Sequence, residues 1–508
     1  MGSKPTVIII TPPVTSPVEP PAGGYLFAGI LAGRRIPVKY YDANLDYYYF
    51  LLDHARPKGL KCWDFIRRHP HYSSAVYQSR TGVIEQEIKY LLKSFPGWQI
   101  TLNHADYAPI SAHHPQAWAD YLRSSTSPVT PFTSYIHHRL LPYILDQPES
   151  IIGISVSFLP QLYFAIELAI RLQSLGITPV IGGCLLKSYR KYHPALPAIF
   201  SELFSLPAEG DRFEFAGEWF DTQTDLNMIR FPETVIPLDH YLAPQIVMPL
   251  MTSKGCYYSR CRFCPEQETR FSMIEAPSLE SFMQETERHF PDQSILYHFI
   301  DSAIPPSFIR RNIHSGPSTR RYYGFVRFEA DFLEAGLIKA MHYSGWEMLQ
   351  WGLESASPSI LERFRKGIRL ENVIPILSES ARYGIRNFLY LLMGLPGETE
   401  SDRMASLLFL KQNPQIYHFL NLSIFNLPDQ PDIDSLCRDW NIQLENLTRY
   451  QGDFSFYRPW REQHGIPRIQ ARQFINQQMM SDTHIRAKIK DTPVPLKSDH
   501  APFIQVSS

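Results

Sequence analysis

The sequence predicts an α/β protein with two successive parallel sheets, the second of which curves into a full or partial barrel. Short β-branched runs alternate with amphipathic stretches in two long regions, residues 1–235 and about 245–430. Strands that alternate with helices form parallel sheets, and such sheets bind ligands outside the carboxyl ends of their strands. A chain of 508 residues is also too long for one ordinary core, so at least two domains are expected.

The first region contains two separate strand–helix–strand units. Their strands are expected at residues 6–10, 36–42, 151–158 and 178–183, and their helices within 20–35 and from about 161 to 175. The second helix carries Leu162, Ala165 and Ala169 on one face, the spacing of a helix that packs on a sheet. Residues of about 50–150 interrupt the alternation and are rich in Tyr, His and Pro. A mostly helical insertion is predicted there.

The second region repeats the strand–helix pattern in consecutive units. Strands are expected early in the segment 325–345, at 346–355 and early in the segment 386–399. Gly345, Gly367 and Gly384 stand where glycine commonly ends a helix. Four or more such units in a row predict a full or partial barrel. Residues 431–508 lack the pattern and are expected to form a small C-terminal lobe.

The composition argues against several classes of function. A formal net charge of −1 gives no electrostatic reason to expect binding to nucleic acid or to a membrane surface. No apolar run approaches the ~20 residues of a membrane-spanning helix, and the first residues do not resemble a signal peptide. Six cysteines are too few for a disulfide scaffold in a chain of this length. We therefore expect a reducing, cytoplasmic location without a membrane span.

Three of the six cysteines lie within nine residues. Cys256, Cys261 and Cys264 form a C-x4-C-x2-C triplet, which is too dense for chance buried thiols. A structural zinc site requires a fourth ligand, and His289 follows Cys264 only after 25 residues. An iron–sulfur cluster with one open iron is the favoured interpretation. The other cysteines are isolated and are expected to be buried like small apolar residues; they are Cys62, Cys184 and Cys437.

The triplet and four later segments together resemble the radical S-adenosylmethionine (SAM) superfamily. The segments follow in the order expected for that barrel: FID at 299–301, WGLES at 351–355, ERFRKGI at 362–368 and GIRNFLYLLMGLPGETESD at 384–402. The usual spacing in the superfamily is C-x3-C-x2-C, so one extra residue separates the first two cysteines here. The resemblance implies that Cys256, Cys261 and Cys264 hold a [4Fe–4S] cluster whose fourth iron binds SAM.

The resemblance also implies a set of SAM contacts around the barrel. They are Phe263, Asp301, Glu354, Ser355, Gly394, Pro396 and Gly397. Two of these roles have a structural alternative, because Glu354 can instead form a salt bridge on the barrel rim and Pro396 can belong to a plain strand-to-helix turn. Arg327 and Glu329 are candidates for contact with SAM or substrate, with exposed strand residues as the alternative.

The amino-terminal region resembles the cobalamin-binding domain that precedes the barrel in one branch of the superfamily. The matching segments lie within residues 10–46, 153–161, 179–184 and 207–211. The resemblance implies a doubly wound, Rossmann-like domain whose tail slot is lined by Ser155, Ser157, Gly182 and Gly183. No D-x-H-x-x-G motif follows the first strand, so cobalt would have no histidine ligand from that motif.

These resemblances imply a cobalamin-dependent radical SAM enzyme. The expected activity is methyl transfer to an unactivated carbon or to phosphorus, through a 5′-deoxyadenosyl radical and methylcobalamin. One alternative keeps SAM cleavage but performs cyclisation, rearrangement or transfer of another SAM-derived group. A second is a non-catalytic scaffold with a structural zinc loop. Expected partners are a small-molecule or peptide substrate and an electron donor such as flavodoxin or ferredoxin, without nucleic acid.

Overall fold

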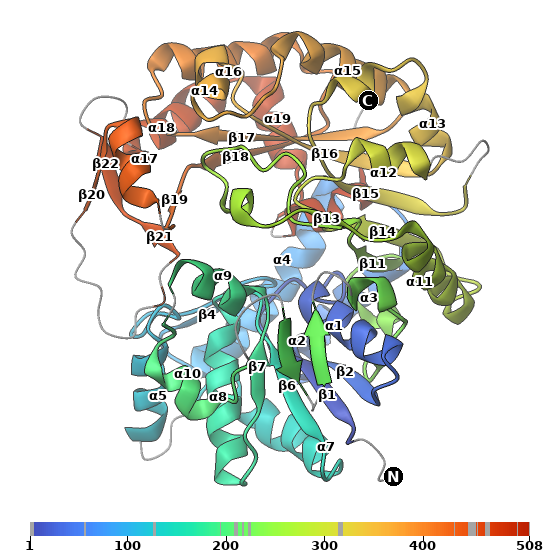
Figure 1. Ribbon diagram of the computed structural model, residues 1–508, viewed down its shortest axis with the longest axis vertical. Coiled ribbons are helices and arrows are strands. Elements are labelled where there is room, and N and C mark those ends of the chain that lie inside the picture. The colour runs from blue at the N-terminus through green and yellow to red at the C-terminus, as the bar shows by residue number, and fades with distance from the viewer. Residues whose placement is uncertain are drawn as a thin grey trace.

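The computed structural model describes residues 5–506 apart from short gaps. The residues outside the description are 1–4, 55–56, 125–128, 194, 208–211, 216–217, 222–224, 313–317, 431, 446–453, 455, 463–467, 495 and 507–508. Two parallel sheets form the centre of the molecule, one in the lower half and one in the upper half of Figure 1. The predicted α/β fold class is confirmed.

The first sheet has the strand order β10-β2-β1-β6-β7, and all of its pairs are parallel. The strands are β1 (Val7–Thr11), β2 (Val38–Asp42), β6 (Ile151–Ser155), β7 (Val180–Gly182) and β10 (Glu233–Thr234). The helices next to them in the chain are α1 (Ala22–Gly33), α8 (Gln161–Ser174) and α9 (Cys184–Tyr192). Because β2 and β6 lie on opposite sides of β1, the carboxyl ends of β1 and β6 border the crevice where doubly wound sheets bind ligands.

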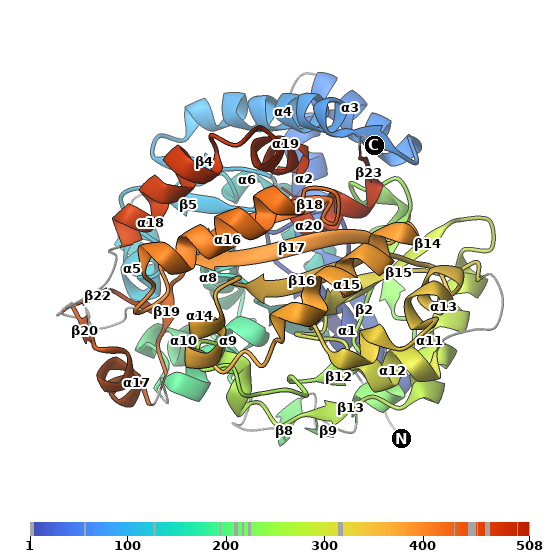
Figure 2. The same ribbon diagram turned by 90° about the horizontal axis from the view of Figure 1, so that it is seen from above.

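The segment between β2 and β6 consists mainly of helices. They include α2 (Ala43–Asp53), α3 (Lys58–Arg68), α4 (Ser74–Leu91), α5 (Pro115–Ser124) and α7 (Leu141–Leu145), with a hairpin of β4 (Trp98–Ile100) and β5 (Ala105–Tyr107). Helix α4 lies beside α19 (Thr483–Asp491) from the end of the chain (Figure 2). The last strand, β23 (Ile504–Gln505), pairs with β3 (Tyr72–Ser73), so the end of the chain contacts this segment directly.

The second sheet contains six parallel strands in chain order, β11-β14-β15-β16-β17-β18. Their bounds are β11 (Ile246–Leu250), β14 (Ile295–Phe299), β15 (Arg321–Val326), β16 (Trp346–Glu354), β17 (Arg386–Met393) and β18 (Phe419–Ile424). The helices between them are α11 (Ala276–His289), α12 (Pro306–Arg311), α13 (Leu337–Tyr343), α14 (Pro358–Arg363), α15 (Leu370–Arg382) and α16 (Glu400–Gln412). This repeat is the succession of strand–helix units that the sequence predicts.

A small unit follows the barrel and stands at the left of Figure 1. It contains α17 (Ile433–Trp440) and two short antiparallel pairs, β19 (Leu427–Pro428) with β21 (Tyr457–Arg458) and β20 (Ile442–Leu444) with β22 (Trp460–Glu462). Helices α18 (Arg468–Phe474), α19 and α20 (Lys497–His500) then return along the barrel. Among the described residues, no helix is both long and apolar enough to cross a membrane.

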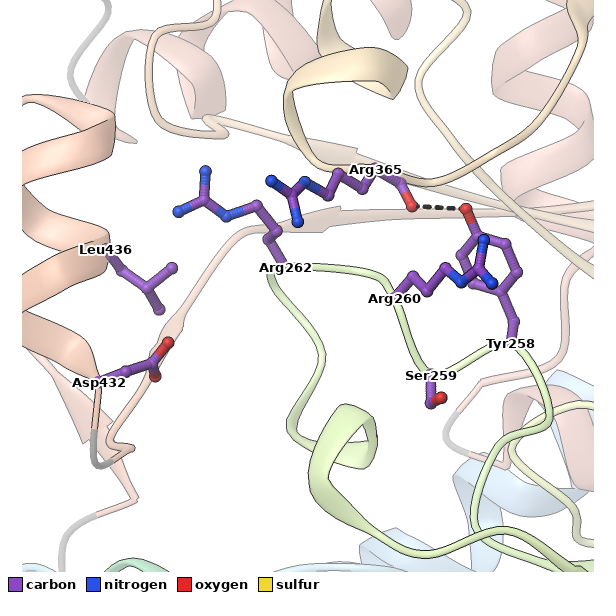
Figure 3. Close-up of a pocket in the computed structure, with 7 residues that line it drawn as sticks. All are labelled: Tyr258, Ser259, Arg260, Arg262, Arg365, Asp432 and Leu436. Atoms are coloured by element: carbon purple, nitrogen blue, oxygen red, sulfur yellow. Dashed lines mark hydrogen bonds between the residues drawn. The ribbon is translucent and has the colours of Figure 1, made fainter.

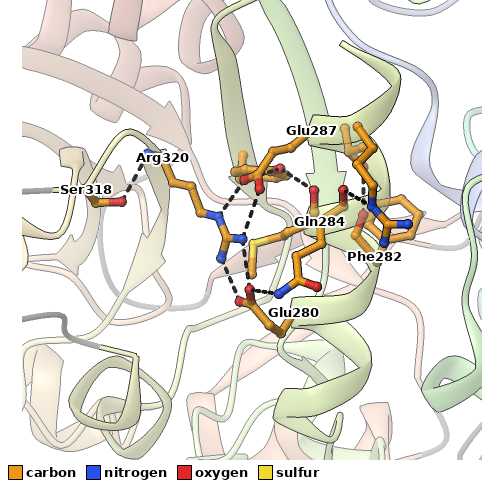
Figure 4. A network of polar contacts seen from close by, with 10 residues as sticks. Glu280, Phe282, Gln284, Glu287, Ser318 and Arg320 are labelled. Atoms are coloured by element: carbon orange, nitrogen blue, oxygen red, sulfur yellow. Dashed lines mark hydrogen bonds and ion pairs between the residues drawn. The ribbon is translucent and has the colours of Figure 1, made fainter. Parts of the chain in front are cut away.

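One guanidinium fastens helix α11 to the barrel at the amino end of β15. Arg320 contacts Glu280 through Nη1 at 2.6 Å and through Nη2 at 2.9 Å (Figure 4). Its Nε and Nη2 also donate to the two oxygens of Glu287, at 2.5 and 3.1 Å. The side chain of Arg320 is only 14% exposed, so this pairing is less screened than an ordinary surface ion pair.

Replacing Arg320 should therefore destabilise the barrel. We expect Arg320→Met to lower the free energy of unfolding by about 1–2 kcal/mol, because two carboxylates of α11 lose a bidentate partner. Urea denaturation followed by circular dichroism measures this change. The matched control is Arg382→Met, which removes a 72% exposed arginine from an i,i+3 pair with Glu379 and should change stability by less than about 0.5 kcal/mol. Equal losses in both variants would contradict the expectation.

Candidate active site

The cysteine loop begins directly after β11, at the carboxyl end of the first barrel strand. Its start is held by Asp301, which follows β14 and is 2% exposed. The Asp301 carboxylate accepts hydrogen bonds from the Thr252 backbone at 2.9 Å, from Thr252 Oγ1 at 2.7 Å and from Ser253 Oγ at 2.7 Å. Burial raises the pKa of Asp301, while these hydrogen bonds lower it. The structure thus places Asp301 beneath the loop, where it positions the backbone; its predicted contact with SAM stays a prediction.

The loop is closed at its base by a short antiparallel pair. Strand β12 (Ser253–Lys254) pairs with β13 (Ser272–Met273), and all three cysteines lie between them. Gly255 has φ +74°, and a Cβ there would lie 2.9 Å from Thr269 O, so only glycine fits this turn without strain. Ser259 also has a positive φ, +42°, within the four residues that separate the first two cysteines. A local left-handed turn therefore accommodates the unusual C-x4-C spacing.

The two tyrosines of the loop attach it to neighbouring parts of the barrel. Tyr257 donates through its hydroxyl to Glu329 Oε1 at 3.1 Å, just beyond β15. Tyr258 donates to the backbone oxygen of Arg365 at 2.8 Å, just beyond α14. The loop is therefore fixed at two points, although it is one residue longer than the usual spacing.

Arg327 lies at the centre of this arrangement. Its Nη1 is 3.5 Å from Cys261 Sγ, its Nη2 donates to Lys366 O at 2.5 Å, and its Nε donates to Glu329 at 3.1 Å. The guanidinium also lies 3.6 Å from the centre of the Tyr258 ring, a cation–π contact. Arg327 is 4% exposed, so the alternative of an exposed strand residue is wrong. A buried cation is costly unless partners such as these replace the water that it has lost.

The three loop thiols are free and form no disulfide. Burial raises the pKa of Cys261, and the positive charges of Lys366 and Arg327 partly oppose that effect. Burial likewise raises the pKa of Cys264 to about 12. Among the isolated cysteines, Cys62 is buried as predicted, whereas the prediction for Cys184 is wrong. Cys184 is exposed because it begins α9 at the edge of the first sheet.

Glu354 ends β16 and pairs with a lysine that the sequence did not single out. Lys366 Nζ lies 2.8 Å from Glu354 Oε1, and both side chains are largely buried, at 9% and 14% exposure. Glu354 has φ +68° beside a register shift in β16, a conformation that is costly for a residue other than glycine. The salt bridge left open by the sequence is therefore present. Strain at this strand end still marks Glu354 as a functional candidate.

Two further carboxyl groups accept hydrogen bonds from the GLPG turn after β17: the buried Glu398 and the partly exposed Glu462 of β22. Gly394 has φ +73°, and its N–H donates to Glu398 Oε2 at 2.6 Å; the N–H of Gly397 donates to Glu462 Oε1 at 3.0 Å. Burial raises the pKa of Glu398 to about 8, although the Gly394 N–H lowers it. Gly397 also has positive φ, and a Cβ there would collide with the Arg363 guanidinium. Sequence reasoning found this turn but not its carboxylates.

Phe263 connects the cysteine loop with the GLPG turn. Its ring packs against Phe364 at 6.0 Å and joins an apolar cluster that also contains Leu395 and Phe425. Pro396 follows Leu395 in the turn. Two segments that the sequence predicts to contact SAM are therefore neighbours in space. Ser355, in contrast, is fully buried and contacts Ser406 Oγ at 3.4 Å, so its hydroxyl is used in packing β16 against α16.

A basic hollow of about 650 Å³ opens between the cysteine loop and α17 (Figure 3). Its lining residues are Tyr258, Ser259, Arg260, Arg262, Arg365, Asp432 and Leu436. Arg260 and Arg262 flank Cys261 in the chain, so the hollow lies against the outer side of the thiol loop. Three arginines face one carboxylate in the lining, which makes this surface positive.

The chain is similar to known proteins both in sequence and in structure. No family model matches the sequence. A segment of 184 residues is 25% identical to an uncharacterized methyltransferase of Pyrococcus horikoshii and covers 35% of this chain and 40% of that protein. Two structures of TsrM, a radical SAM methyltransferase from Kitasatospora setae, match 99% and 100% of the chain and 91% of TsrM, with TM-scores of 0.51 and 0.50 at 12% identity. One contains tryptophan and aza-SAM, the other cobalamin and a [4Fe–4S] cluster.

The chain has the fold of these TsrM structures. A structure of the cobalamin-dependent radical SAM enzyme OxsB with aqua-cobalamin also matches, over 77% of this chain and 65% of OxsB, with a TM-score of 0.49 at 16% identity. The chain thus spans less than two thirds of OxsB and of the Pyrococcus protein.

The crevice of the first sheet contains the residues that are predicted to line a cobalamin tail slot. A Cβ on Gly23, in the first turn of α1, would lie 3.1 Å from Ser157 Oγ and 3.5 Å from Ser155 Oγ. A Cβ on Gly182 would meet nothing within 4 Å, so open space adjoins that glycine. Gly183 has φ +112° and packs on the backbone of Val156, which requires glycine for the chain's own packing.

Burial of the loop thiols predicts low reactivity in the metal-free chain. At pH 8 a thiol with a pKa of about 12 is only about one part in 10⁴ thiolate, the form that iodoacetamide attacks. We expect Cys184, which is exposed, to react at least about tenfold faster than Cys264 in the folded protein. Mass spectrometry of timed samples measures both rates. In urea the rates should converge; equal rates without urea would contradict the expectation.

Proposed function

We propose that the chain is a cobalamin-dependent radical SAM enzyme that transfers a methyl group to an unactivated carbon or to phosphorus. The observation that carries the proposal is the three-thiol loop at the carboxyl end of the first strand of a six-stranded parallel barrel, which a doubly wound sheet precedes. The names of the similar proteins support methyl transfer, since TsrM and the Pyrococcus relative are both called methyltransferases.

The residues of the loop fit a three-thiolate cluster site. Three free thiols stand on one ordered loop, and Arg327 and Lys366 place positive charge beside Cys261. These cations offset the negative charge that three thiolates bring into a largely buried site. When bound, a [4Fe–4S] cluster supplies the electron that cleaves SAM to methionine and a 5′-deoxyadenosyl radical, and methylcobalamin supplies the methyl group.

The side chains around the loop would bind SAM and exclude water. Phe263 and Leu395 offer an apolar wall for the adenine, and the turn Gly394–Gly397 allows its backbone to approach closely. Glu354 would orient the ammonium or ribose hydroxyls while Lys366 holds its other side. Ser155, Ser157 and Gly182 would line the cobalamin tail slot.

Two alternatives differ in what they require of the chain. Non-methylating radical chemistry uses the same loop and barrel, and only cobalamin retention separates it from methyl transfer. A zinc-filled scaffold needs a fourth ligand at the loop, and the described surroundings of Cys261 are two cations, Arg327 and Lys366. A substrate of small-molecule or peptide class and a reducing, cytoplasmic location remain part of the proposal.

Metal analysis with a SAM cleavage assay tests the proposal. After anaerobic reconstitution with iron, sulfide and cobalamin, we expect about four irons and one cobalt per chain. Addition of SAM and dithionite should then release 5′-deoxyadenosine. Cys261→Ala should lose iron and SAM cleavage, whereas Cys437→Ala, a thiol of α17 outside the loop, should keep both.

Each contrary outcome selects one alternative. Iron and deoxyadenosine without cobalt would reject methyl transfer and support the non-methylating reaction. Zinc that disappears with Cys261→Ala, together with no SAM cleavage, would reject the enzyme and support the scaffold.

The electron donor is proposed to bind at the basic hollow. Arg260 and Arg365 are exposed, and Arg262, the third arginine of the lining, pairs with Asp439 of α17. An acidic flavodoxin or ferredoxin seated there would lie next to the chain positions that flank Cys261. Complementary charge of this kind accelerates association and makes it sensitive to salt.

Charge reversal tests this docking surface. In Arg260→Glu/Arg365→Glu we expect reduction of the cluster by an acidic flavodoxin to slow by about tenfold or more at low salt. Reduction by dithionite, a small molecule, should be unchanged. Arg288→Glu/Arg382→Glu alters charge equally on exposed faces of α11 and α15 and serves as the matched control. If the control slows as much, net charge and not this surface is responsible.

A further inference from the structure

A histidine and two carboxylates meet where three distant parts of the chain come together. Glu19 belongs to the loop between β1 and α1, His298 to barrel strand β14, and Asp499 to α20 near the end of the chain. One ligand-capable atom from each lies within 4.8 Å of the other two. None of these residues belongs to the cysteine loop, and Glu19 lies in the loop that follows the carboxyl end of β1.

The contacts within this group are close and largely shielded from solvent. His298 Nδ1 lies 2.8 and 3.0 Å from the two oxygens of Glu19, and the side chains are 10% and 14% exposed. Asp499 Oδ2 accepts a hydrogen bond from Ser16 Oγ at 2.9 Å, which fixes it against the same loop that carries Glu19. The three side chains are therefore held in place by different elements before any ligand is added.

Negative charge in this group exceeds the positive charge available. In the part of the chain that the structure describes, neither Glu19 nor Asp499 forms an ion pair with a lysine or arginine. Burial lowers the pKa of His298, but Glu19, Asp499 and Asp301 outweigh burial and raise it. Burial also raises the pKa of Glu19, but one proton shared by Glu19 and His298 neutralises only one of the two carboxylates. Uncompensated charge in a partly buried group is costly, so the group is chemically suited to a cation.

A polar atom beside His298 has no partner. The ring of Tyr323 stacks on the imidazole, with centres 4.2 Å apart and planes 7° from parallel. Tyr323 is completely buried and lies near Glu19 and Asp499, and its hydroxyl has no hydrogen-bond partner within the described residues. An unpartnered buried hydroxyl beside two carboxylates is the kind of exception that a missing ion or water explains.

We propose that Glu19, His298 and Asp499 bind a divalent metal ion, and that this site ties the amino-terminal domain, the barrel and the C-terminal segment together. One imidazole and two carboxylates are the ligand set of borderline divalent ions such as Zn²⁺. The metal replaces the proton that Nδ1 shares with Glu19, and its double charge balances both carboxylates. The fourth position stays open to water or to another oxygen ligand.

Zinc binding to the full-length chain with Cys256, Cys261 and Cys264 all replaced by alanine tests the site. In that background a loop-bound metal is absent, so failure of the proposed function leaves the result unaffected. After chelator treatment and dialysis against Zn²⁺ alone, we expect about one zinc per chain by elemental analysis. X-ray absorption should show nitrogen or oxygen neighbours at about 2.0–2.2 Å and no sulfur at about 2.3 Å.

Isosteric substitutions separate this site from adventitious binding. In the same background, Asp499→Asn and His298→Gln should each weaken zinc binding by about tenfold or more, and zinc should raise the melting temperature of the parent but not of these variants. His240→Gln, which alters an exposed histidine paired with Asp239, is the matched control and should bind zinc like the parent. Circular dichroism establishes that each variant is folded.

The inference is overturned by either of two results. One is that the parent without the three loop cysteines binds well below one zinc per chain. The other is that folded Asp499→Asn and His298→Gln both retain parental affinity, which would place the zinc elsewhere.

Discussion

The burial of Arg327 is the constraint on which the rest of the candidate site depends. A guanidinium cannot lose its charge at ordinary pH, so in the interior it has to be surrounded by acceptors and aromatic faces. Its partners are the cysteine loop, Lys366 in the segment after α14, and Glu329, two residues further along its own segment. The first two are far from Arg327 in the chain, and their contacts with this one cation hold them at fixed distances from each other. The thiol of Cys261 thereby acquires a defined place relative to the barrel.

Around this centre other carboxyl groups are held by a lysine or by backbone N–H groups. Lys366 holds Glu354, while the N–H groups of the glycine turn hold Glu398 and Glu462. Each carboxylate has at least one specific partner. The two N–H donors belong to residues with positive φ, a conformation that favours glycine. The small unit containing β22 supplies Glu462, so the barrel rim is completed by residues that follow the barrel in sequence.

The sequence was sufficient to predict the elements that depend on residues close together in the chain. Period-2 and period-3.6 apolar patterns, with glycines at helix ends, predicted the strands β1, β2, β6, β16 and β17 and the helix α8 close to their observed bounds. The cysteine triplet was visible because its residues are adjacent in the chain. Lys366, Glu398 and the Glu19–His298–Asp499 group could not be found this way. Their roles arise from proximity across tens to hundreds of residues, and no local pattern distinguishes a buried lysine or glutamate from a surface one. Arg327 was found, but its burial was not.

The pairing of β23 with β3 sets an order of events during biosynthesis. The final described residues close onto a segment made more than 400 positions earlier, Ile504 beside Tyr72. Domains emerge from the ribosome from the amino terminus onward, and contacts of such long range form last. The first sheet can therefore fold while the barrel is still being translated, and the two halves become locked together only when the last helix and strand arrive. Until that moment the cysteine loop belongs to an unfinished sheet, and its thiols are more accessible than in the folded chain.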